Sequence, residues 1–98
     1  MPPLKPESDA ALKATVTGRV QGVYYRAFVK RLAAELKLTG WVRNMPDTSV
    51  QLHVEGDKTN LEELLENLKQ GPPGARVDNV EVTWAEPTGD FPDFTVTG

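Results

Sequence analysis

The ten residues Gly18–Ala27, GRVQGVYYRA, combine two glycines, two arginines and no acidic residue. They follow an alternating run typical of a strand and precede a run with helical spacing. A glycine-containing turn from a strand into a helix presents backbone N–H groups at the helix N-terminus, where unsatisfied donors and the helix dipole favour an anion. Arg26 can point a forked guanidinium at the same place. The stretch therefore predicts an anion site that suits a phosphate group.

From spacing alone, an ordinary structural interpretation of this stretch stays open. Any strand-to-helix turn can contain glycine, and Arg19 and Arg26 can be solvated surface charges. A nucleotide-binding P-loop with magnesium is not indicated, because no Gly-Lys-Ser/Thr sequence follows the turn.

A second polar group lies in GWVRN, residues 40–44. Counting by twos along an extended chain, Val42 and Asn44 share one face, while Trp41 and Arg43 share the other. A buried amide needs hydrogen-bonding partners. Asn44 can bond the neighbouring backbone and support the following turn, or it can take part in chemistry, and the residues alone leave both open.

The composition restricts the sites that this chain can build. Its 98 residues include no cysteine and one histidine, His53, so thiol nucleophiles, disulfides and zinc clusters are excluded and no metal site is expected. A formal net charge of −3 argues against a nucleic-acid partner. No apolar run approaches the roughly 20 residues that span a bilayer, and the N-terminus lacks the apolar region of a signal peptide. We therefore expect a cytoplasmic protein without a membrane partner.

The elements that position these groups follow from hydrophobic spacing. Alternation predicts strands at 12–18, 41–45, 50–56 and 77–86, with a short final strand at 94–96. In the fourth strand, Val80, Val82 and Trp84 are expected to face inward. His53 falls on the polar face of its strand, and we expect it to be exposed.

Two helices are predicted between these strands. The first carries an apolar stripe from Tyr25 to Leu36, with Tyr25 in the core and Tyr24 exposed. The second lies within residues 57–71, where a capping box at Thr59 and Glu62 and a C-cap at Gly71 are expected.

The order of elements predicts an α+β fold. One antiparallel sheet with both helices on one face buries every apolar stripe, which is the ferredoxin-like βαββαβ sandwich. Residues 1–10 contain three of the chain's eight prolines and no periodic pattern, so we expect a flexible N-terminal tail and a single domain over 11–98.

The stretches GRVQGVYYR and GWVRN resemble, in order and spacing, the two signature motifs of the acylphosphatase family, and the similarity covers residues 12–97. The resemblance implies hydrolysis of acyl phosphates to a carboxylate and inorganic phosphate without a cofactor. It implies that Arg26 binds the phosphate and that Asn44 orients the attacking water. It also implies a phosphate-binding loop whose backbone amides come from Arg19, Val20, Gln21, Gly22, Val23, Tyr24 and Tyr25.

The resemblance also implies the partners. We expect a small-molecule acyl phosphate as substrate, inorganic phosphate as product and inhibitor, and a monomer. The alternative is a non-catalytic ferredoxin-like module that binds phosphate or an acyl or carbamoyl phosphate, similar to the N-terminal domain of hydrogenase maturation factors. We expect no fused domain, and this favours the free enzyme.

One position departs from the family pattern. Thr48 stands where the family has a turn glycine. Pro46 and Asp47 suit the two central positions of a type I turn, so we expect Thr48 to have a negative φ and to begin the next strand. The alternative is a positive φ, which would strain a β-branched residue.

Overall fold

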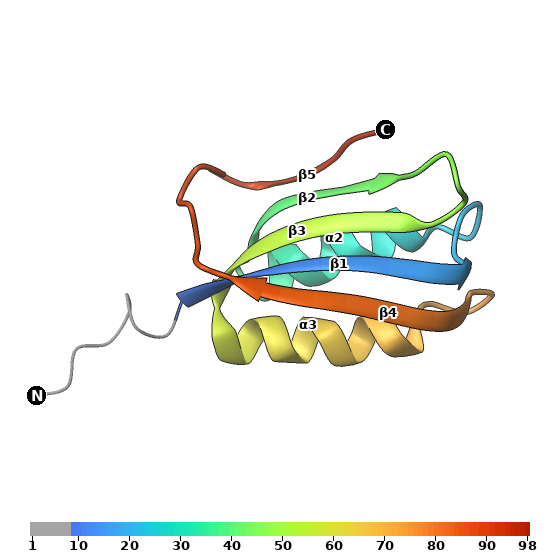
Figure 1. The fold of residues 1–98 in the computed structure, drawn as a ribbon, viewed down its shortest axis with the longest axis horizontal. Helices are drawn as coiled ribbons and strands as arrows, with labels where there is room; N and C mark the ends of the chain where they lie inside the picture. The colour runs from blue at the N-terminus through green and yellow to red at the C-terminus, as the bar shows by residue number, and fades with distance from the viewer. Residues whose placement is uncertain (1–8) are drawn as a thin grey trace, which may run out of the picture.

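The structure, a computed structural model, describes residues 9–98. Five strands form one sheet in the spatial order β4-β1-β3-β2-β5 (Figure 1). In chain order they are β1 (Asp9–Arg19), β2 (Thr39–Asn44), β3 (Val50–Asp57), β4 (Arg76–Ala85) and β5 (Phe94–Val96).

The pairing confirms the predicted fold class and adds one feature to it. β1 runs antiparallel to both β3 and β4, and β2 runs antiparallel to β3. β5 instead pairs parallel with β2, so the sheet is mixed rather than wholly antiparallel. The reason is that β4 ends at the end of the sheet where β2 begins, so a strand laid along β2 from there runs in the same direction (Figure 1).

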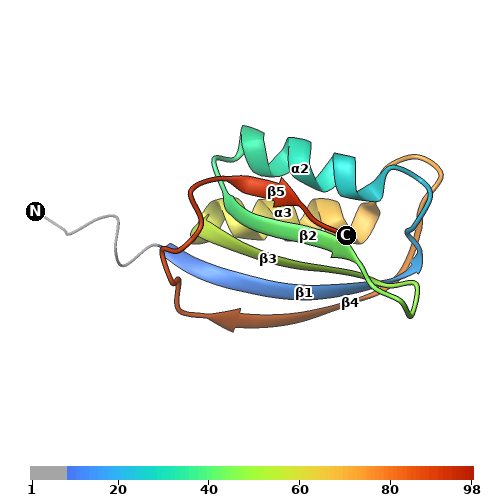
Figure 2. The ribbon, with the colours of Figure 1, turned by 90° about the horizontal axis from the view of Figure 1, so that it is seen from above.

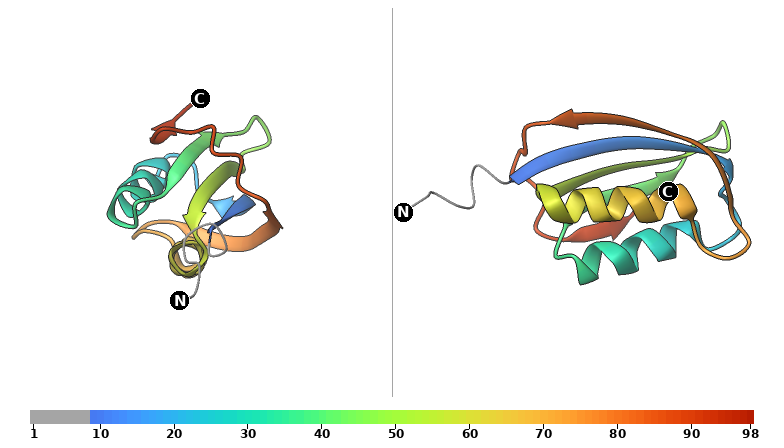
Figure 3. Two further views of the ribbon diagram at one scale, coloured as in Figure 1. Left: turned by 90° about the vertical axis from the view of Figure 1, so that its left-hand side faces the viewer. Right: turned by 90° about the horizontal axis from the view of Figure 1, so that it is seen from below.

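Both helices, α2 (Tyr25–Glu35) and α3 (Lys58–Gln70), cover one face of the sheet and leave the other open (Figure 2). The end-on view shows the same two layers (Figure 3). Burial of the helix stripes against the inner face of the sheet forms the core, and this apolar burial is the main stabilising term. Among its fully buried side chains are Tyr25, Val29, Val42, Leu52, Leu61, Leu64 and Leu68.

The ends of α3 confirm one predicted cap and correct the other. Gly71 ends the helix with φ of 75°, as expected for a glycine C-cap. The N-cap is Asp57 rather than Thr59, since Asp57 Oδ1 accepts a hydrogen bond from the Thr59 N–H at 2.9 Å. Asp57 thus caps the N–H two residues further on, and this bond takes the place of the expected capping box, which has a spacing of three residues.

The edges of the sheet differ from the sequence-based expectation at two points. Asp9 and Ala10 pair with Asp57 and Gly56, so the first strand includes the last two residues of the expected tail. The rest of that tail, residues 1–8, lies outside the described residues. Trp84 faces the helix layer as expected, with Lys58 Nζ 5.4 Å from the centre of its ring, but it is still 40% exposed because β4 is an edge strand.

The fold brings two connections together at one end of the molecule. The loop between β1 and α2 and the turn between β2 and β3 both lie at the end opposite the start of β1 (Figure 1). The predicted anion-binding stretch and Asn44 are thus neighbours in space.

Candidate active site

The chain leaves β1 through a bulge. The register against β4 shifts between Thr17 and Gly18. Gly18 has φ of 126°, and a Cβ there would lie 2.1 Å from the carbonyl oxygen of Arg76. Only glycine allows the strand to end this close to β4, so Gly18 determines how the chain enters residues 19–25, the predicted phosphate-binding loop, called the phosphate loop below.

The phosphate loop then turns into α2 without a side-chain cap. The N-cap residue, Tyr24, has a left-handed backbone with φ of 61°, and within residues 9–98 no side chain caps the helix. The first turn of α2 is also free of acidic residues in this described part of the chain. The N–H groups at this helix end are therefore available to an anion.

Two aromatic neighbours in the phosphate loop have opposite environments, as predicted. Tyr25 is buried, and its hydroxyl donates to the carbonyl oxygen of Leu68 at 2.8 Å, which ties the start of α2 to the end of α3. Burial raises the pKa of the Tyr25 phenol, so this hydroxyl stays a donor. Tyr24 is 85% exposed.

A hollow of about 500 Å³ opens beside the phosphate loop and contains both predicted key side chains. It is lined by Val20, Gly22, Tyr24, Tyr25, Arg26, Ala27, Lys30, Asn44 and Val96. Arg19, Gln21 and Val23, the remaining predicted loop residues, lie outside this lining.

Three of the lining residues were not predicted. Lys30 follows Arg26 by one helical turn, so helical spacing places both on one face of α2 and could have indicated it. Ala27 and Val96 carry no chemical signal in the sequence, and Val96 reaches the hollow only because β5 pairs with β2.

Arg26 and Asn44 both reach a single oxygen atom. A guanidinium N–H of Arg26 donates to the carbonyl oxygen of Gly98, and the backbone N–H of Asn44 donates to the same oxygen at 3.5 Å. Gly98 thus lies between Arg26 and Asn44.

The side chain of Asn44 carries an unusual acceptor. Its Oδ1 atom is buried and, among the residues that the structure describes, accepts no hydrogen bond. A buried acceptor without a donor costs about 1–3 kcal/mol. Asn44 as a residue lines the hollow, so this unsatisfied acceptor lies close to it.

The turn that follows Asn44 overturns one expectation. Pro46 and Asp47 occupy the centre of the turn as predicted, and the Thr48 N–H donates to the carbonyl oxygen of Met45 at 3.1 Å. Thr48, however, has φ of 76°, so the expected negative φ is wrong. Met45 and Ser49 close the turn, and a hairpin loop of three residues requires a left-handed third residue.

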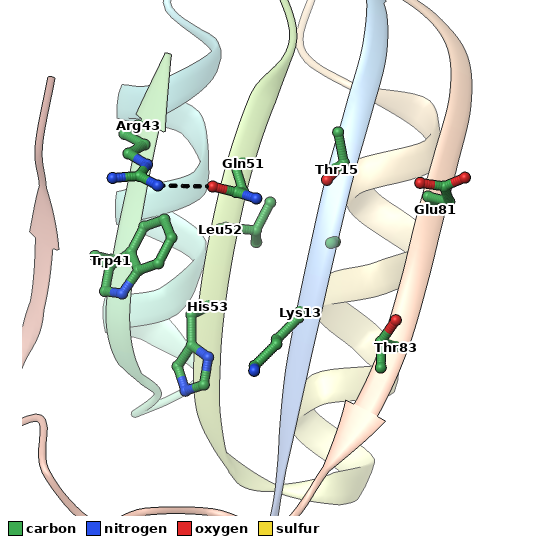
Figure 4. Close-up of a pocket in the computed structure, with 10 residues that line it drawn as sticks. Lys13, Thr15, Trp41, Arg43, Gln51, Leu52, His53, Glu81 and Thr83 are labelled. Atoms are coloured by element: carbon green, nitrogen blue, oxygen red, sulfur yellow. Dashed lines mark hydrogen bonds between the residues drawn. The ribbon is translucent and has the colours of Figure 1, made fainter. Parts of the chain in front are cut away.

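A second hollow, of about 460 Å³, lies on the open face of the sheet (Figure 4). Lys13, Trp41, Arg43 and Gln51 are among its lining residues, and Arg43 lies 4.8 Å from the centre of the Trp41 ring. Because Arg43 also donates to Gln51 Oε1 at 3.0 Å, its guanidinium is held by side chains of the sheet. Neither the predicted catalytic residues, Arg26 and Asn44, nor any residue of the phosphate loop lines this hollow. We therefore assign it no part in catalysis.

His53 corrects another expectation. It lies on the polar face of β3 as predicted. We expected an exposed side chain, but His53 is buried, with 8% of its surface exposed. Phe91, from the segment after β4, packs against it with ring centres 5.1 Å apart, and its Nε2 lies 2.7 Å from Glu55 Oε2. The covering segment could not be placed from strand alternation alone.

Glu55 holds that covering segment. Its carboxylate accepts hydrogen bonds from the N–H and hydroxyl of Thr88 and from the N–H of Gly89, at 2.9–3.0 Å. Burial works to raise the pKa of Glu55, but the bonds from His53, Thr88 and Gly89 outweigh it and lower the pKa to about 2. Glu55 is therefore an ionised structural residue.

Residues 9–98 contain no cluster of three or more histidine, cysteine or acidic side chains placed to hold a metal ion. Neither helix in this part is long and apolar enough to cross a membrane.

Comparison with known proteins decides the family. The acylphosphatase family model matches residues 12–96. The chain belongs to the acylphosphatase family. An acylphosphatase of Methylococcus capsulatus is 52% identical over 81 residues, which cover 83% of this chain and 88% of the relative. The structure of an acylphosphatase from Coxiella burnetii matches with a TM-score of 0.89 and 38% identity, over 96% of this chain and 98% of that one.

One further similar structure bears on the alternative function. Full-length HypF, solved in a phosphate- and nucleotide-bound form, matches with a TM-score of 0.84 and 30% identity, but the match covers only 12% of that chain. The acylphosphatases match over nearly their whole length. The chain is thus a hydrolase that acts on acyl phosphates, and this function is supported over a non-catalytic binding module.

Proposed function

We propose that a water molecule held by Asn44 attacks an acyl phosphate whose phosphate group is held by Arg26 and the backbone amides of residues 19–25. The observation that carries the proposal is that Arg26 and Asn44 line one hollow, and that Asn44 Oδ1 accepts no hydrogen bond from residues 9–98. A fixed acceptor for water and a cation for phosphate are the two groups that this reaction needs most.

Arg26 and the phosphate loop stabilise charge on the phosphate. A planar guanidinium can form two parallel bonds to a phosphate, and charge-assisted bonds of this kind are about twice as strong as neutral ones. The uncapped end of α2 adds backbone donors and the positive end of the helix dipole. In the transition state the equatorial oxygens carry the spread charge, so these fixed donors lower the barrier.

Asn44 positions the nucleophile. The water donates one hydrogen to Asn44 Oδ1, which directs its oxygen at the phosphorus atom. A new bond forms between that oxygen and phosphorus while the bond from phosphorus to the acyl oxygen breaks. The departing carboxylate takes the bonding electrons, and the proton of the water passes to a phosphate oxygen.

The leaving group explains why the site needs no general acid. Carboxylic acids have a pKa of about 4, so a carboxylate leaves as an anion at neutral pH without being protonated. Inorganic phosphate, the other product, fits the same donors as the substrate and is proposed to inhibit by competition. A monomer in the cytoplasm, without nucleic-acid or membrane partners, stays a prediction from the sequence.

Release of phosphate from acetyl phosphate and benzoyl phosphate tests the proposal, with Arg26→Ala and Arg31→Ala as a matched pair. Both arginines lie on α2, but Arg31 is exposed and outside the lining of the hollow. Loss of Arg26 is expected to lower kcat/KM by about 10²–10³-fold and to weaken inhibition by phosphate, while the Arg31 variant stays at the parent rate. Near-parental hydrolysis by a folded Arg26→Ala variant contradicts the proposed role.

A further inference from the structure

The side chain of Gln21 links the two connections that form the active site. Its Nε2 atom donates to the carbonyl oxygens of both Met45 and Ser49, each at 2.9 Å. Gln21 belongs to the phosphate loop, whereas Met45 and Ser49 belong to the turn after Asn44. The two connections lie at the same end of the sheet (Figure 1), and this one amide joins them.

The two acceptors form the base of the β2–β3 turn. The Met45 N–H donates to the Ser49 carbonyl at 2.8 Å, and the Thr48 N–H donates to the Met45 carbonyl. Each carbonyl oxygen has two lone pairs, so each accepts one bond within the turn and one from Gln21. The link thus adds to the bonds of the turn and replaces none of them.

The geometry leaves Gln21 without a hydrogen for substrate. An amide nitrogen carries two hydrogens, and both are used on Met45 and Ser49. The side chain is also partly buried and lies outside the lining of the hollow. The backbone N–H is therefore the only donor of Gln21 that is left to bind a phosphate in the phosphate loop.

We infer that Gln21 is a positioning residue, which sets the distance between the phosphate loop and Asn44. Asn44 pairs with Val50 at the very end of the β2–β3 ladder, so the ladder supports it from one side only. Beyond it the turn contains Thr48 in a left-handed conformation, which an L residue adopts at a cost of about 1–2 kcal/mol. The link from Gln21 reaches Met45, the residue next to Asn44, and holds the turn against the loop.

The consequence for the reaction rests on the proposed function. In-line attack requires reacting atoms to lie about 3–3.5 Å apart, and a misplacement of about 1 Å can lower the rate about 10²-fold. Without the link, the phosphate loop and Asn44 are both intact, but the distance between them is no longer fixed. Loss of the link should therefore lower turnover while phosphate affinity is kept.

Gln21→Met tests the inference, because methionine has a similar length and no N–H donor. Gln51→Met is the matched control: Gln51 also forms a side-chain hydrogen bond, but with Arg43 on the open face. We expect Gln21→Met to lower kcat for acetyl phosphate about tenfold to a hundredfold. The inhibition constant of inorganic phosphate should change by less than about threefold, and the control should change neither value.

A double-mutant cycle with Asn44→Ala asks whether Gln21 acts through Asn44. If it does, Gln21→Met lowers kcat little further once Asn44 is absent. Independent, additive losses overturn the inference. So does an unchanged kcat in Gln21→Met, or a rise in the phosphate inhibition constant that matches the loss of kcat, because that rise would make Gln21 a phosphate ligand.

Amide hydrogen exchange gives a readout that does not need activity. Gln21→Met should speed exchange at the Thr48 N–H of the turn without changing exchange in the β1–β3 ladder, and unchanged exchange at Thr48 rejects the link. If the Met variant fails to fold, Gln21→Asn breaks the same bonds by shortening the side chain by one methylene. An inactive parent protein rejects the proposed function, whereas the exchange result decides on the link alone.

Discussion

Buried polar groups at the two ends of the sheet differ in whether they have hydrogen-bond partners. At one end, the Glu55 cluster, which comprises His53, Glu55, Thr88 and Gly89, pairs a buried carboxylate with several donors at 2.7–3.0 Å. At the other end, Asn44 has a buried oxygen that accepts no bond from residues 9–98. The satisfied Glu55 cluster stabilises the fold, whereas Asn44 has an acceptor that is left for a ligand.

The backbone does not follow this contrast. Tyr24 and Thr48 at the active-site end have left-handed conformations, and so does Lys37 between α2 and β2 at the opposite end. The difference between the ends thus lies in their buried polar groups. Substitutions of these groups should separate activity from stability.

Asn44→Ala should have the largest effect, and it should act on turnover. Loss of the water-holding oxygen is expected to lower kcat by about 10²-fold or more, because the nucleophile is no longer held in line. The free energy of unfolding should not fall by more than about 1 kcal/mol, since the lost acceptor made no bond within residues 9–98 and its burial was unfavourable. Steady-state kinetics and a denaturant melt measure these two quantities, and inhibition by phosphate is measured beside them.

For Asn44 the inhibition constant is the deciding control. If phosphate binding weakens as much as kcat falls, Asn44 binds substrate rather than water. Such a result would also remove the contrast between the two ends, because it would give Asn44 an ordinary ligand-binding role.

Glu55→Gln should act on stability and leave kcat unchanged. The pKa of Glu55 is lowered to about 2 from an ordinary value of 4.5. Stability from the ionised carboxylate is therefore fully present above about pH 4.5 and is lost as the pH falls towards 2. The shift corresponds to about 2–3 kcal/mol, so the parent should lose about this much between pH 5 and pH 2.

Denaturant melts at several pH values check the Glu55 prediction. The Gln variant should start less stable at pH 7 and show a flatter dependence on pH in the acid range. Glu62→Gln, an exposed change on α3, serves as the control and should keep the parent's slope. A parent-like slope in Glu55→Gln would show that other groups govern acid stability.

Thr48→Gly should have the smallest effect, a gain of about 0.5–1 kcal/mol in stability. Relief of the left-handed strain, about 1–2 kcal/mol, exceeds the extra unfolded-state entropy of glycine, about 0.4–1 kcal/mol. Thr48→Ala keeps a Cβ in the left-handed region and should gain much less. A melt in which Gly and Ala behave alike would mean that φ of this residue does not limit stability.

Local patterns in the sequence account for most of the fold. Alternation located every strand, and the leucine stripe from Leu61 to Leu68 located α3, because each buries one face of a regular element. Contacts made by irregular segments could not be predicted in this way. Burial of His53 depends on Phe91, and the parallel direction of β5 depends on where the preceding segment crosses the sheet.

In the candidate site, too, local sequence patterns predicted some features, and features that depend on distant contacts were missed. Arg26 and Asn44 were predicted from motif residues, and the structure places them around one hollow. Their roles remain predictions. The link from Gln21 was beyond sequence reasoning, since a glutamine in a loop gives no sign of which distant carbonyls it meets. The conformation of Thr48 was predicted wrongly because turn propensities of Pro46 and Asp47 do not fix the residue after them.

The short strand β5 replaces the longer strand β2 at one edge of the sheet. It covers the backbone of β2 from Gly40 to Val42, which would otherwise be a free edge able to pair with a foreign strand. The segment that delivers β5 is held in place by Glu55 through Thr88 and Gly89. We expect protonation of that carboxylate in acid to loosen this segment and expose β2, and light scattering should then rise as the pH falls towards 2.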